Sequence, residues 1–586
     1  MASGESVASA IANLYAGAKR LLVLRKAESV CGALLLLMAV NLLASISRKS
    51  ITNDEIVHIP AGYYHLVAGE FQLNNEHPPL VKMWAALPLL IVQPDEPPAP
   101  KTEDENFMER TWGFHERFWQ ANQARFQTVT FWPRVMMIPI TLALGVLIFV
   151  FARKLFGETA GLIAVALYVL EPTVLAHGRV VHTDVPAALA YLLFFFALHR
   201  YSEAPGKMRA LVLGLVSALA LLTKFSMLVL LPVLAIYFLA RLFINWRDRK
   251  QRTQILFQSA VITEVVLFLV NAAYYFQRPA LEASDVRWVA MKSPALLGFV
   301  TTIVRLASYL VPTYYLFGVY NIEVHNHFGH ATSLLGQYND QGWWYYFPVA
   351  FALKTTIPFL LLAIVGLGWS VWRLVKRDWR FLWLVTPVCI YLAISLTSHI
   401  NIGIRHFLPV YPFLFIAGGA LLARLLQARR TVGVAVMVVL FGWMGFEAIR
   451  TYPNYTPYMN QLASSHPHWY YLSDSNVEWG DDVGELAAYL KARGETKVRA
   501  ALSGGWSTLG RYGVDYLDMV SLPPDKPPET RYVAIGASFL NGSVIPGDEN
   551  VVGRRFFERT NLFARYRDRK PEAVFGNSIY LFREHE

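Results

Sequence analysis

The sequence predicts a multi-span α-helical membrane protein of about eleven transmembrane helices, with amphipathic helices in its outer loops and a small C-terminal α/β domain. Three observations support this fold class. Of the 586 residues, 55% are hydrophobic and only 16% are charged, well below the ~25% typical of soluble domains. Apolar runs of about bilayer length recur as far as Phe446, and short Lys/Arg clusters separate them. From Tyr452 onward the charged residues increase, and no run is long enough to span.

The net charge of +11 does not indicate nucleic-acid binding. The cations lie in the short segments between apolar runs, where cytoplasmic loops keep them, and they form no basic stripe interleaved with aromatic residues. Cys31 and Cys389 both fall in apolar runs, so we expect buried small side chains rather than a disulfide or metal ligands. No small-residue cleavage site follows the first apolar run, which should therefore stay as an anchor.

The first span is expected at about 29–47, and a long outer loop, 48–128, follows it. Thr52 and Glu55 fit a capping box at the start of an amphipathic helix that should end near Ala68. A second helix should start near Pro78-Pro79. Two outer-side cations, Arg48 and Lys49, run against the charge bias. The cations before the first span predict a cytoplasmic N-terminus; they are Lys19, Arg20, Arg25 and Lys26.

The remaining spans follow from the length of the apolar runs and from the Lys/Arg clusters that separate them. A second long outer loop, 277–344, is expected between spans seven and eight. We assign 1–450 to a membrane domain and 451–586 to an extracytoplasmic α/β domain, with a helix near 483–490 and strands near 497–502 and 531–535. Spans two to five are expected at about 130–151, 159–176, 185–199 and 210–222. Span six returns to Arg241, span seven covers about 255–276, and span eight covers about 346–371. Span nine ends at Ser398, span ten starts at Arg405, and span eleven covers about 431–446.

This topology places several acids and histidines on one side of the membrane, the outer one. Asp54 comes directly after a span and lies one helical turn before His58 on the same helix face. A carboxylate there can take a proton from an attacking hydroxyl or amine, so Asp54 is the candidate base. Glu55 is a candidate too, although the capping box explains it equally well.

Two further motifs lie on the same side. Glu76-His77 opens a Pro-Pro turn; it either forms a plain loop-to-helix turn or orients Asp54 and contacts phosphate. Asp184 is either a helix cap or a second carboxylate that holds the acceptor or orients a cation. The spacing of the histidines matches no ligand signature such as HExxH. We therefore expect no tightly held metal, while a loosely bound divalent cation stays an open alternative.

Placing a charged side chain within or at the end of a membrane span costs free energy, so each such cation invites a functional interpretation. Lys224 and Arg405, with His406 beside the latter, are the preferred partners for a phosphate group, on which negative charge builds as it leaves. Snorkelling to the interface is the alternative, above all for Arg134 and Lys354. The full set of such cations is Arg134, Arg179, Lys224, Arg305, Lys354 and Arg405.

Five motifs together resemble bacterial members of the dolichyl-phosphate-mannose–protein mannosyltransferase superfamily, which includes the aminoarabinose transferase of lipid A. They are the DE pair at 54–55, EHPPL at 76–80, TD at 183–184, IRHFLPVYPF at 404–413 and SDSNVEWGDD at 473–482. The resemblance implies a GT-C fold, a polyprenyl-phosphate-linked sugar donor and inversion on the extracytoplasmic face. It also implies that Asp54 is the base and Asp184 the second acid. The lipid A enzyme has a lysine where this chain has His77, which leaves the acceptor and the phosphate contact open.

The resulting hypothesis is a glycosyltransferase of the bacterial inner membrane that passes a sugar from a polyprenyl phosphate to an envelope lipid, glycan or protein. A transporter or flippase is an alternative, but such proteins show paired repeats and sites near the midplane. A non-catalytic envelope-assembly protein, with the C-terminal domain as a binding module, is another. The predicted catalytic residues are Asp54, Glu55 and Asp184, and the predicted substrate-binding residues are His58, Glu76, His77, Lys224, Arg405 and His406.

Overall fold

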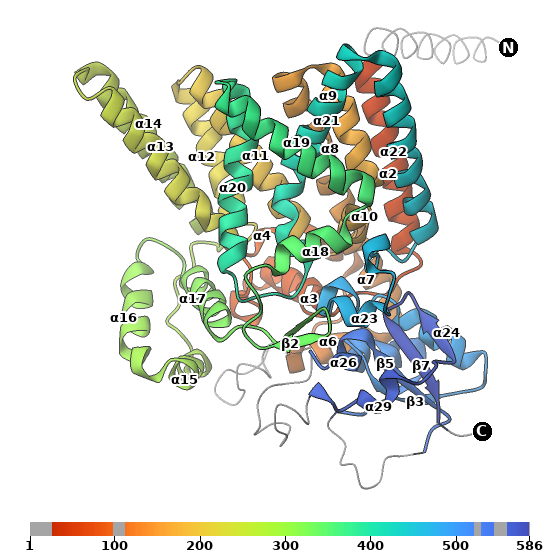
Figure 1. Ribbon diagram of the computed structural model, residues 1–586. Helices are drawn as coiled ribbons and strands as arrows, with labels where there is room; N and C mark the ends of the chain where they lie inside the picture. The colour runs from red at the N-terminus through yellow and green to blue at the C-terminus, as the bar shows by residue number, and fades with distance from the viewer. Residues whose placement is uncertain (1–25, 98–111, 521–528, 544–559, 585–586) are drawn as a thin grey trace, which may run out of the picture.

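The computed structural model describes residues 26–97, 112–520, 529–543 and 560–584, so the N-terminal cations up to Arg25 lie outside the described residues. Within this part of the chain, nine helical segments are long and apolar enough to cross a membrane, and they stand side by side in one bundle (Figure 1). Their main helices are α2 (Lys26–Ile46), α8 (Met137–Phe156), α11 (Asp184–Glu203), α13 (Leu230–Ile244), α14 (Arg249–Ala273), α19 (Ile357–Val375), α20 (Leu382–Thr397), α21 (Tyr411–Ala428) and α22 (Arg430–Thr451).

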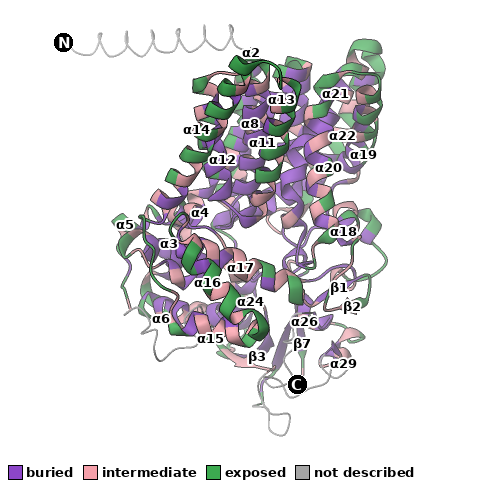
Figure 2. Ribbon diagram, turned by 90° about the vertical axis from the view of Figure 1, so that its left-hand side faces the viewer, coloured by how far each residue is buried: buried purple, intermediate pink, exposed green. Residues whose placement is uncertain are grey.

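Two shorter helices complete the bundle at the positions predicted for spans three and five. They are α9 (Glu158–Leu170), which continues through the bend at Pro172 into α10 (Pro172–His177), and α12 (Lys207–Leu221). Large apolar side chains point outward from the bundle, for example Leu36 of α2 at 65% exposure, and the exposed residues lie on the outer faces of the helices (Figure 2). Such surfaces are too apolar for water and suit lipid. The predicted fold class is therefore confirmed.

The span predicted at 346–371 is two helices, not one. A short helix, α18 (Tyr346–Lys354), lies across the lower end of the bundle, and the spanning helix α19 starts only at Ile357 (Figure 1). Between them Thr355 and Thr356 are extended, with ψ near 138° and 139°. Pro358 falls in the first turn of α19, where its missing N–H costs nothing, whereas inside a continuous helix it would break a hydrogen bond.

The two cysteines differ in their surroundings. Cys31 is buried, as expected, but Cys389 is exposed on α20, so the prediction for Cys389 was wrong. Helix α20 lies at the surface of the bundle. An apolar run in such a helix is consistent with contact with lipid as well as with burial in the protein, so it does not predict that Cys389 is buried.

The first outer-loop helix, α3 (Asn53–Val67), begins with the predicted capping box. The Thr52 amide donates to Glu55 Oε2 at 2.7 Å, and the Glu55 amide donates to Thr52 Oγ1 at 3.4 Å. The helix is buried along its whole middle, more deeply than an interfacial helix. Gly62 lies against the backbone of α4 (Leu80–Ala86), and Trp119 of α6 (Phe114–Ala121) donates to the Ile56 carbonyl at 2.8 Å.

The segment 277–344, which was predicted to be a second outer loop, is folded. It contains α15 (Ala283–Lys292), α16 (Leu297–Ala307), α17 (Thr313–Phe328) and a small hairpin of β1 (Thr332–Leu334) and β2 (Gln337–Asn339). These elements lie beyond the same end of the bundle as α3 (Figure 1).

The C-terminal region carries a five-stranded mixed sheet at that end of the bundle (Figure 1). The strand order is β4-β3-β5-β7-β6, with β3 parallel to both β4 and β5, and with β7 antiparallel to β5 and β6. The predicted helix and both predicted strands are present. The elements are α24 (Val483–Lys491), β3 (Lys497–Ala501), β4 (Asp515–Asp518), β5 (Tyr532–Gly536), β6 (Ala573–Phe575) and β7 (Ile579–Arg583).

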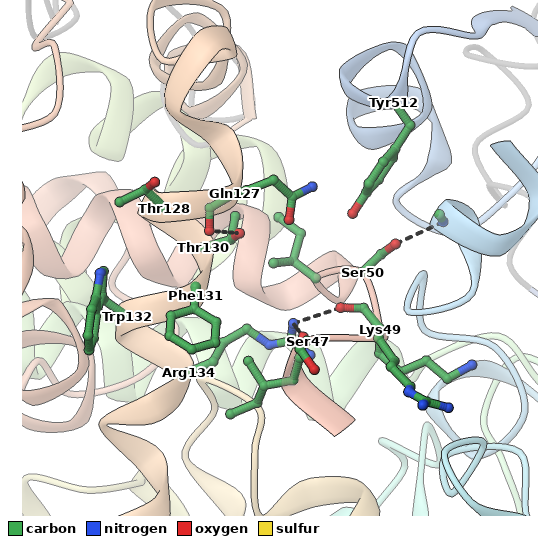
Figure 3. Close-up of a pocket in the computed structure, with 14 residues that line it drawn as sticks. Ser47, Lys49, Ser50, Gln127, Thr128, Thr130, Phe131, Trp132, Arg134 and Tyr512 are labelled. Carbon is green, nitrogen blue, oxygen red and sulfur yellow. Dashed lines mark hydrogen bonds between the residues drawn. The ribbon is translucent and has the colours of Figure 1, made fainter. Parts of the chain in front are cut away.

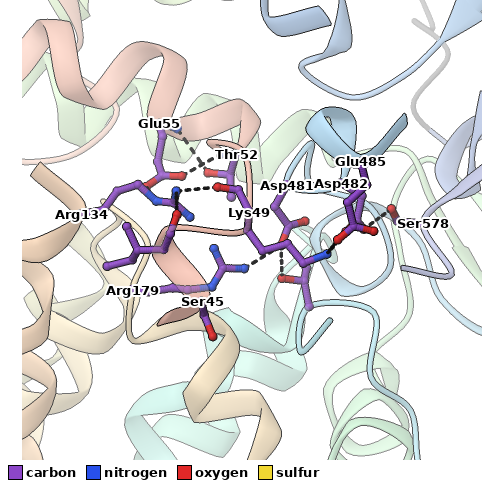
Figure 4. A network of polar contacts seen from close by, with 12 residues as sticks. Ser45, Lys49, Thr52, Glu55, Arg134, Arg179, Asp481, Asp482, Glu485 and Ser578 are labelled. Atoms are coloured by element: carbon purple, nitrogen blue, oxygen red, sulfur yellow. Dashed lines mark hydrogen bonds and ion pairs between the residues drawn. The ribbon is translucent and has the colours of Figure 1, made fainter. Parts of the chain in front are cut away.

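A buried polar network joins the bundle to the C-terminal region (Figure 4). Lys49, just beyond α2, forms ion pairs with Asp482 and, at 2.7 Å, with Glu485. Arg179, in the loop before α11, pairs with Asp481 at 2.7 Å. These contacts give a structural reason for Lys49, whose expected place on the outer side ran against the charge bias: its partners are acids of the C-terminal region.

Replacing Lys49 by Met should destabilise the protein by about 3–5 kcal/mol, because Asp482 would stay buried without its cation. The neighbouring Arg48 is exposed, so Arg48→Met is the matched control and should cost less than about 0.5 kcal/mol. Thermal unfolding of the two variants in detergent, read by aggregation, measures the difference. Equal midpoints for both variants would show that the network does not hold the two regions together.

Candidate functional site

A cavity of about 430 Å³ opens at the end of the bundle where α3, α17 and the C-terminal region meet. Six of the nine predicted site residues line it: Asp54, His58, Glu76, His77, Arg405 and His406. They come from the first turns of α3, the turn before α4 and the 3-10 helix Ile404–Val410 that leads into α21. The structure thus brings together residues that are more than 350 positions apart in the sequence, such as Asp54 and Arg405.

Asp54 is one of three acids that line this cavity, with Glu76 and Asp474, and 22% of its side chain is exposed. Its Oδ2 atom accepts a hydrogen bond from Arg405 Nη1 at 2.7 Å and lies 3.0 Å from His182 Nε2. Burial alone would raise the pKa of Asp54, but the Arg405 guanidinium and His182 hold it well below its usual range. The cavity therefore presents an ionised carboxylate.

Arg405 is itself held in place by two neighbours from the C-terminal region. Its Nε donates to Ser475 Oγ at 2.8 Å, and its guanidinium carbon lies 4.4 Å from the centre of the Trp479 ring. This hydrogen bond and the cation–π contact fix the plane of the guanidinium. The segment that supplies both residues is the one whose sequence resembles the mannosyltransferase motif at 473–482.

Asp184 and Lys224, predicted as a catalytic acid and a phosphate partner, lie behind the cavity and do not line it. Asp184 Oδ2 is 2.5 Å from His182 Nδ1, and Asp184 Oδ1 is 2.5 Å from Lys224 Nζ. Both side chains are buried. The chain of contacts from Lys224 through Asp184 and His182 ends at Asp54, so the geometry gives Asp184 and Lys224 the task of orienting His182.

Glu55 points away from the cavity and is fully buried. Its Oε1 atom accepts from the Val181 amide at 2.9 Å and lies 3.4 Å from Arg134 Nε. Its Oε2 atom accepts from the Thr52 amide. These contacts agree with the capping interpretation, and Figure 4 shows Glu55 directed toward Arg134.

Arg134 and Lys354 do not snorkel, and that alternative was wrong for both. Arg134 Nη1 donates to the Lys49 carbonyl at 2.8 Å, and Lys354 Nζ donates to the carbonyls of Thr456 and Asn476, each at 2.6 Å. Both side chains are buried. They satisfy backbone carbonyls where helices end, which water would otherwise do.

Sequence reasoning missed several residues of the cavity. His182 directly precedes the TD pair at 183–184, and Trp479 lies within the 473–482 motif, so a signal existed for both. Lys292 of α15 had none. Its Nζ lies 5.0 Å from the Trp288 ring centre and 5.5 Å from that of Phe328, and no acidic partner is found for it in the described part of the chain.

A second cavity, of about 460 Å³, lies between the end of α2, the helix α7 (Phe126–Val135) and the start of α24 (Figure 3). It shares no lining residue with the first cavity. Of its cations, Lys49 is paired with Asp482 and Glu485, Arg134 lies beside Glu55, and the exposed Arg48 lies over the Tyr452 ring. None of the predicted site residues lines this cavity, so the candidate site is the first cavity.

Three histidines of the first cavity could hold a metal ion. One ring nitrogen from each of His58, His77 and His182 lies within 4.8 Å of the other two. His58 Nδ1 donates to the Val181 carbonyl at 3.0 Å, which leaves Nε2 as an electron-pair donor. Burial, with His182 nearby, lowers the pKa of His58 to about 3, so the ring is neutral as a ligand must be. The position of Arg405 disfavours a metal ion, because its Nη1 lies 2.7 Å from His182 Nε2, one of the candidate ligand atoms.

Fold and site together define a multi-span membrane protein with a buried acid–cation cavity at one end of its helical bundle. Residues 126–274 match the family model described as dolichyl-phosphate-mannose-protein mannosyltransferase. The matched residues are about a quarter of the chain, so the similarity to this family is shown for that part of the membrane bundle.

No curated protein sequence matches the chain. Similar solved structures share only 10–14% identity with it. ArnT from Cupriavidus metallidurans bound to undecaprenyl phosphate is 12% identical, with 82% of this chain and 74% of that chain covered and a TM-score of 0.44. The Archaeoglobus fulgidus oligosaccharyltransferase in complex with Zn and sulfate is 11% identical, with 89% and 70% covered and a TM-score of 0.47. AglB from the same organism, in complex with an inhibitory peptide and a dolichol-phosphate, is 10% identical, with 88% and 70% covered and a TM-score of 0.44.

The three histidines should bind Zn²⁺ only weakly, because the Arg405 guanidinium occupies the space and supplies the charge that an ion would bring. Protein dialysed against EDTA should then hold less than one metal per chain by inductively coupled plasma mass spectrometry. Arg405→Gln should bind added Zn²⁺ at least tenfold more tightly, and His58→Gln in that background should reverse the gain. A stoichiometric metal that survives dialysis of the unaltered protein would contradict this prediction.

Proposed function

We propose that this chain transfers a sugar from a polyprenyl-phosphate donor to a cell-envelope acceptor, a lipid, glycan or protein, with Asp54 as the base and with inversion. The observation that carries the proposal is an ionised Asp54 that opens to a cavity at one end of the membrane bundle. The family match over 126–274 supports the reaction class.

In the proposed reaction, an acceptor hydroxyl attacks the anomeric carbon of the sugar while Asp54 takes its proton. The bond between that carbon and the phosphate oxygen breaks, and its electron pair leaves with the polyprenyl phosphate. A single displacement of this kind inverts the configuration. Because the attacking oxygen becomes positively charged as its new bond forms, its proton is acidic enough for a carboxylate with a low pKa to accept.

The leaving phosphate needs a cation, and the cavity offers two. Arg405 is already bound to Asp54, so it would have to exchange the carboxylate for phosphate. Lys292 comes from the α15 wall and has its charge held over two aromatic rings. We assign Lys292 to the departing phosphate, because a preorganised cation at developing negative charge lowers the barrier most.

The charge distribution along the bundle supports an extracytoplasmic cavity. Three turns at the opposite end of the bundle, α13–α14, α19–α20 and α21–α22, are rich in Arg and Lys (Figure 1). Such turns stay in the cytoplasm, and in a bacterium the membrane concerned is the inner one. The cavity then faces the compartment in which envelope acceptors are assembled.

Asp54→Asn should lower transfer by ~10²–10⁴-fold, the usual contribution of a positioned base. Glu55→Gln is the matched control, because Glu55 is next to Asp54 in the sequence but faces away from the cavity. We expect this variant to have reduced thermal stability and near-normal transfer per folded molecule. The assay supplies a panel of undecaprenyl-phosphate sugars to membranes that contain each variant, and mass spectrometry of envelope lipids and glycans reads the product.

Two results would count against this role. Full activity of Asp54→Asn would remove Asp54 from the mechanism, and a larger loss in Glu55→Gln at equal folded amount would transfer the role to Glu55. Unchanged envelope glycans with and without the whole protein would reject the proposed function itself.

Lys292→Met should raise the KM for the polyprenyl-phosphate donor about tenfold, because one charged hydrogen bond to phosphate is lost. Arg287→Met is the matched control, since Arg287 is an exposed cation on the same helix and does not line the cavity. Initial rates at increasing donor concentration give both values. If the two variants behave alike, Lys292 does not contact the donor.

A further inference from the structure

A basic hollow of about 270 Å³ lies at the other end of the bundle from the catalytic cavity. It is formed by the end of α8, the α19–α20 turn and the last turns of α21. Three arginines and three aromatic residues make up most of its lining: Arg373, Arg380, Arg424, Phe156, Trp369 and Phe381.

The arginines of this hollow carry more charge than nearby acids balance. Asp378 Oδ2 accepts from Arg373 Nη2 at 2.7 Å and from Arg380 Nη2 at 2.8 Å, so one carboxylate holds two guanidinium groups side by side. Arg424 is exposed, and it has no acidic partner in the described ranges. The hollow therefore keeps a surplus of two positive charges, in a place where no substrate of the proposed reaction would meet it.

Aromatic rings set the direction of these guanidinium groups. The Arg373 guanidinium carbon lies 5.8 Å from the ring centres of both Trp369 and Phe381, and that of Arg380 lies 5.7 Å from the ring of Phe156. Arg380 also donates to the Leu155 carbonyl at the end of α8, at 3.3 Å. The groups are thus preorganised, and planar guanidinium forks match phosphate oxygens well.

The surface around the hollow is apolar and faces outward. On α19, Leu361 and Ile364 are 53% and 61% exposed, and nearer the rim Trp372 is 54% and Trp379 is 64% exposed. Exposed tryptophans at the end of a span are typical of the membrane–water interface. The hollow is smaller than common small-molecule sites of ~300–1,000 Å³, so it suits a head group whose tails lie outside along α19.

We propose that this hollow binds the phosphate head of an acidic phospholipid in the leaflet opposite the catalytic cavity. The inference does not depend on the transfer reaction, because the two sites share no residue. It follows from surplus charge, preorganised arginines and the exposed apolar side chains of α19 and of the rim, since basic pockets between spans bind anionic lipids.

The test is native mass spectrometry of the full chain in micelles that contain equal amounts of phosphatidylglycerol and phosphatidylcholine. We expect phosphatidylglycerol to be retained preferentially, and Arg424→Gln to lower its retention ~fivefold, the effect of one basic residue near an anionic head group. Arg430→Gln removes the same charge at the same end of the bundle but outside the hollow, so it should leave retention unchanged.

Three outcomes would overturn the proposal: no preference for phosphatidylglycerol, an equal loss in Arg430→Gln, or full displacement of the lipid by millimolar inorganic phosphate. The second would show only a general attraction between this end of the bundle and anions, and the third would identify a site for a free anion. Because Arg424 is exposed and has no acidic partner among the described residues, its replacement should not prevent folding, and the retention of phosphatidylcholine provides the internal check.

Discussion

The ion pair between Arg405 and Asp54 is the interaction on which the site depends. Their 2.7 Å contact lies at the floor of a cavity, and removing a buried carboxylate from water costs several kcal/mol unless a cation compensates it. Neither partner is placed by its own helix alone. Asp54 needs the capped start of α3, and Arg405 needs Ser475 and Trp479 from the C-terminal region. The sheet domain thus acts on the site through two side chains.

The same pair also restricts how the site can work. A carboxylate bound to a guanidinium is ionised but has little basicity left, so it can accept a proton only from a group that becomes acidic during the reaction. In the reaction proposed above, the attacking hydroxyl is such a group, because its oxygen gains positive charge as the new bond forms. In that proposal the resting contact with Arg405 keeps Asp54 charged before substrate binds, and bond formation makes the proton acidic enough to be transferred.

Local patterns predicted much of this fold. The apolar runs and the Lys/Arg clusters between them located the spans, and the Thr52–Glu55 spacing marked the start of α3 correctly. A local pattern could not show that the helix breaks at Thr355, since the apolar run continues through the break. It also could not tell which of two adjacent acids faces the cavity, because the rotation of α3 is set by its packing against α4 and α6.

Long-range placement explains the other differences at the site. The topology put Arg405, His77 and Asp54 on one side, and the structure brings them into one cavity. Lys292 had no motif, since its place depends on how the 277–344 loop folds over the bundle. For Arg134 and Lys354 the sequence allowed a snorkelling interpretation, because it does not show which backbone carbonyls lie within reach of a cation. In the structure, backbone carbonyls accept hydrogen bonds from both side chains.

The two ends of the bundle treat their charges in opposite ways. At the cavity end, acids and cations are buried in pairs, as Asp184 with Lys224 and Asp481 with Arg179, so removing a single charge leaves another one stranded in a medium of low dielectric constant. At the other end, Arg380 and Arg424 are exposed, and the three arginines of the described hollow outnumber its one acidic partner, Asp378, so single charges there can be lost at little cost to folding. The first arrangement depends on the protein alone. The second is incomplete without anions from outside the chain, and a membrane surface that is rich in phosphate groups is the nearest source of them.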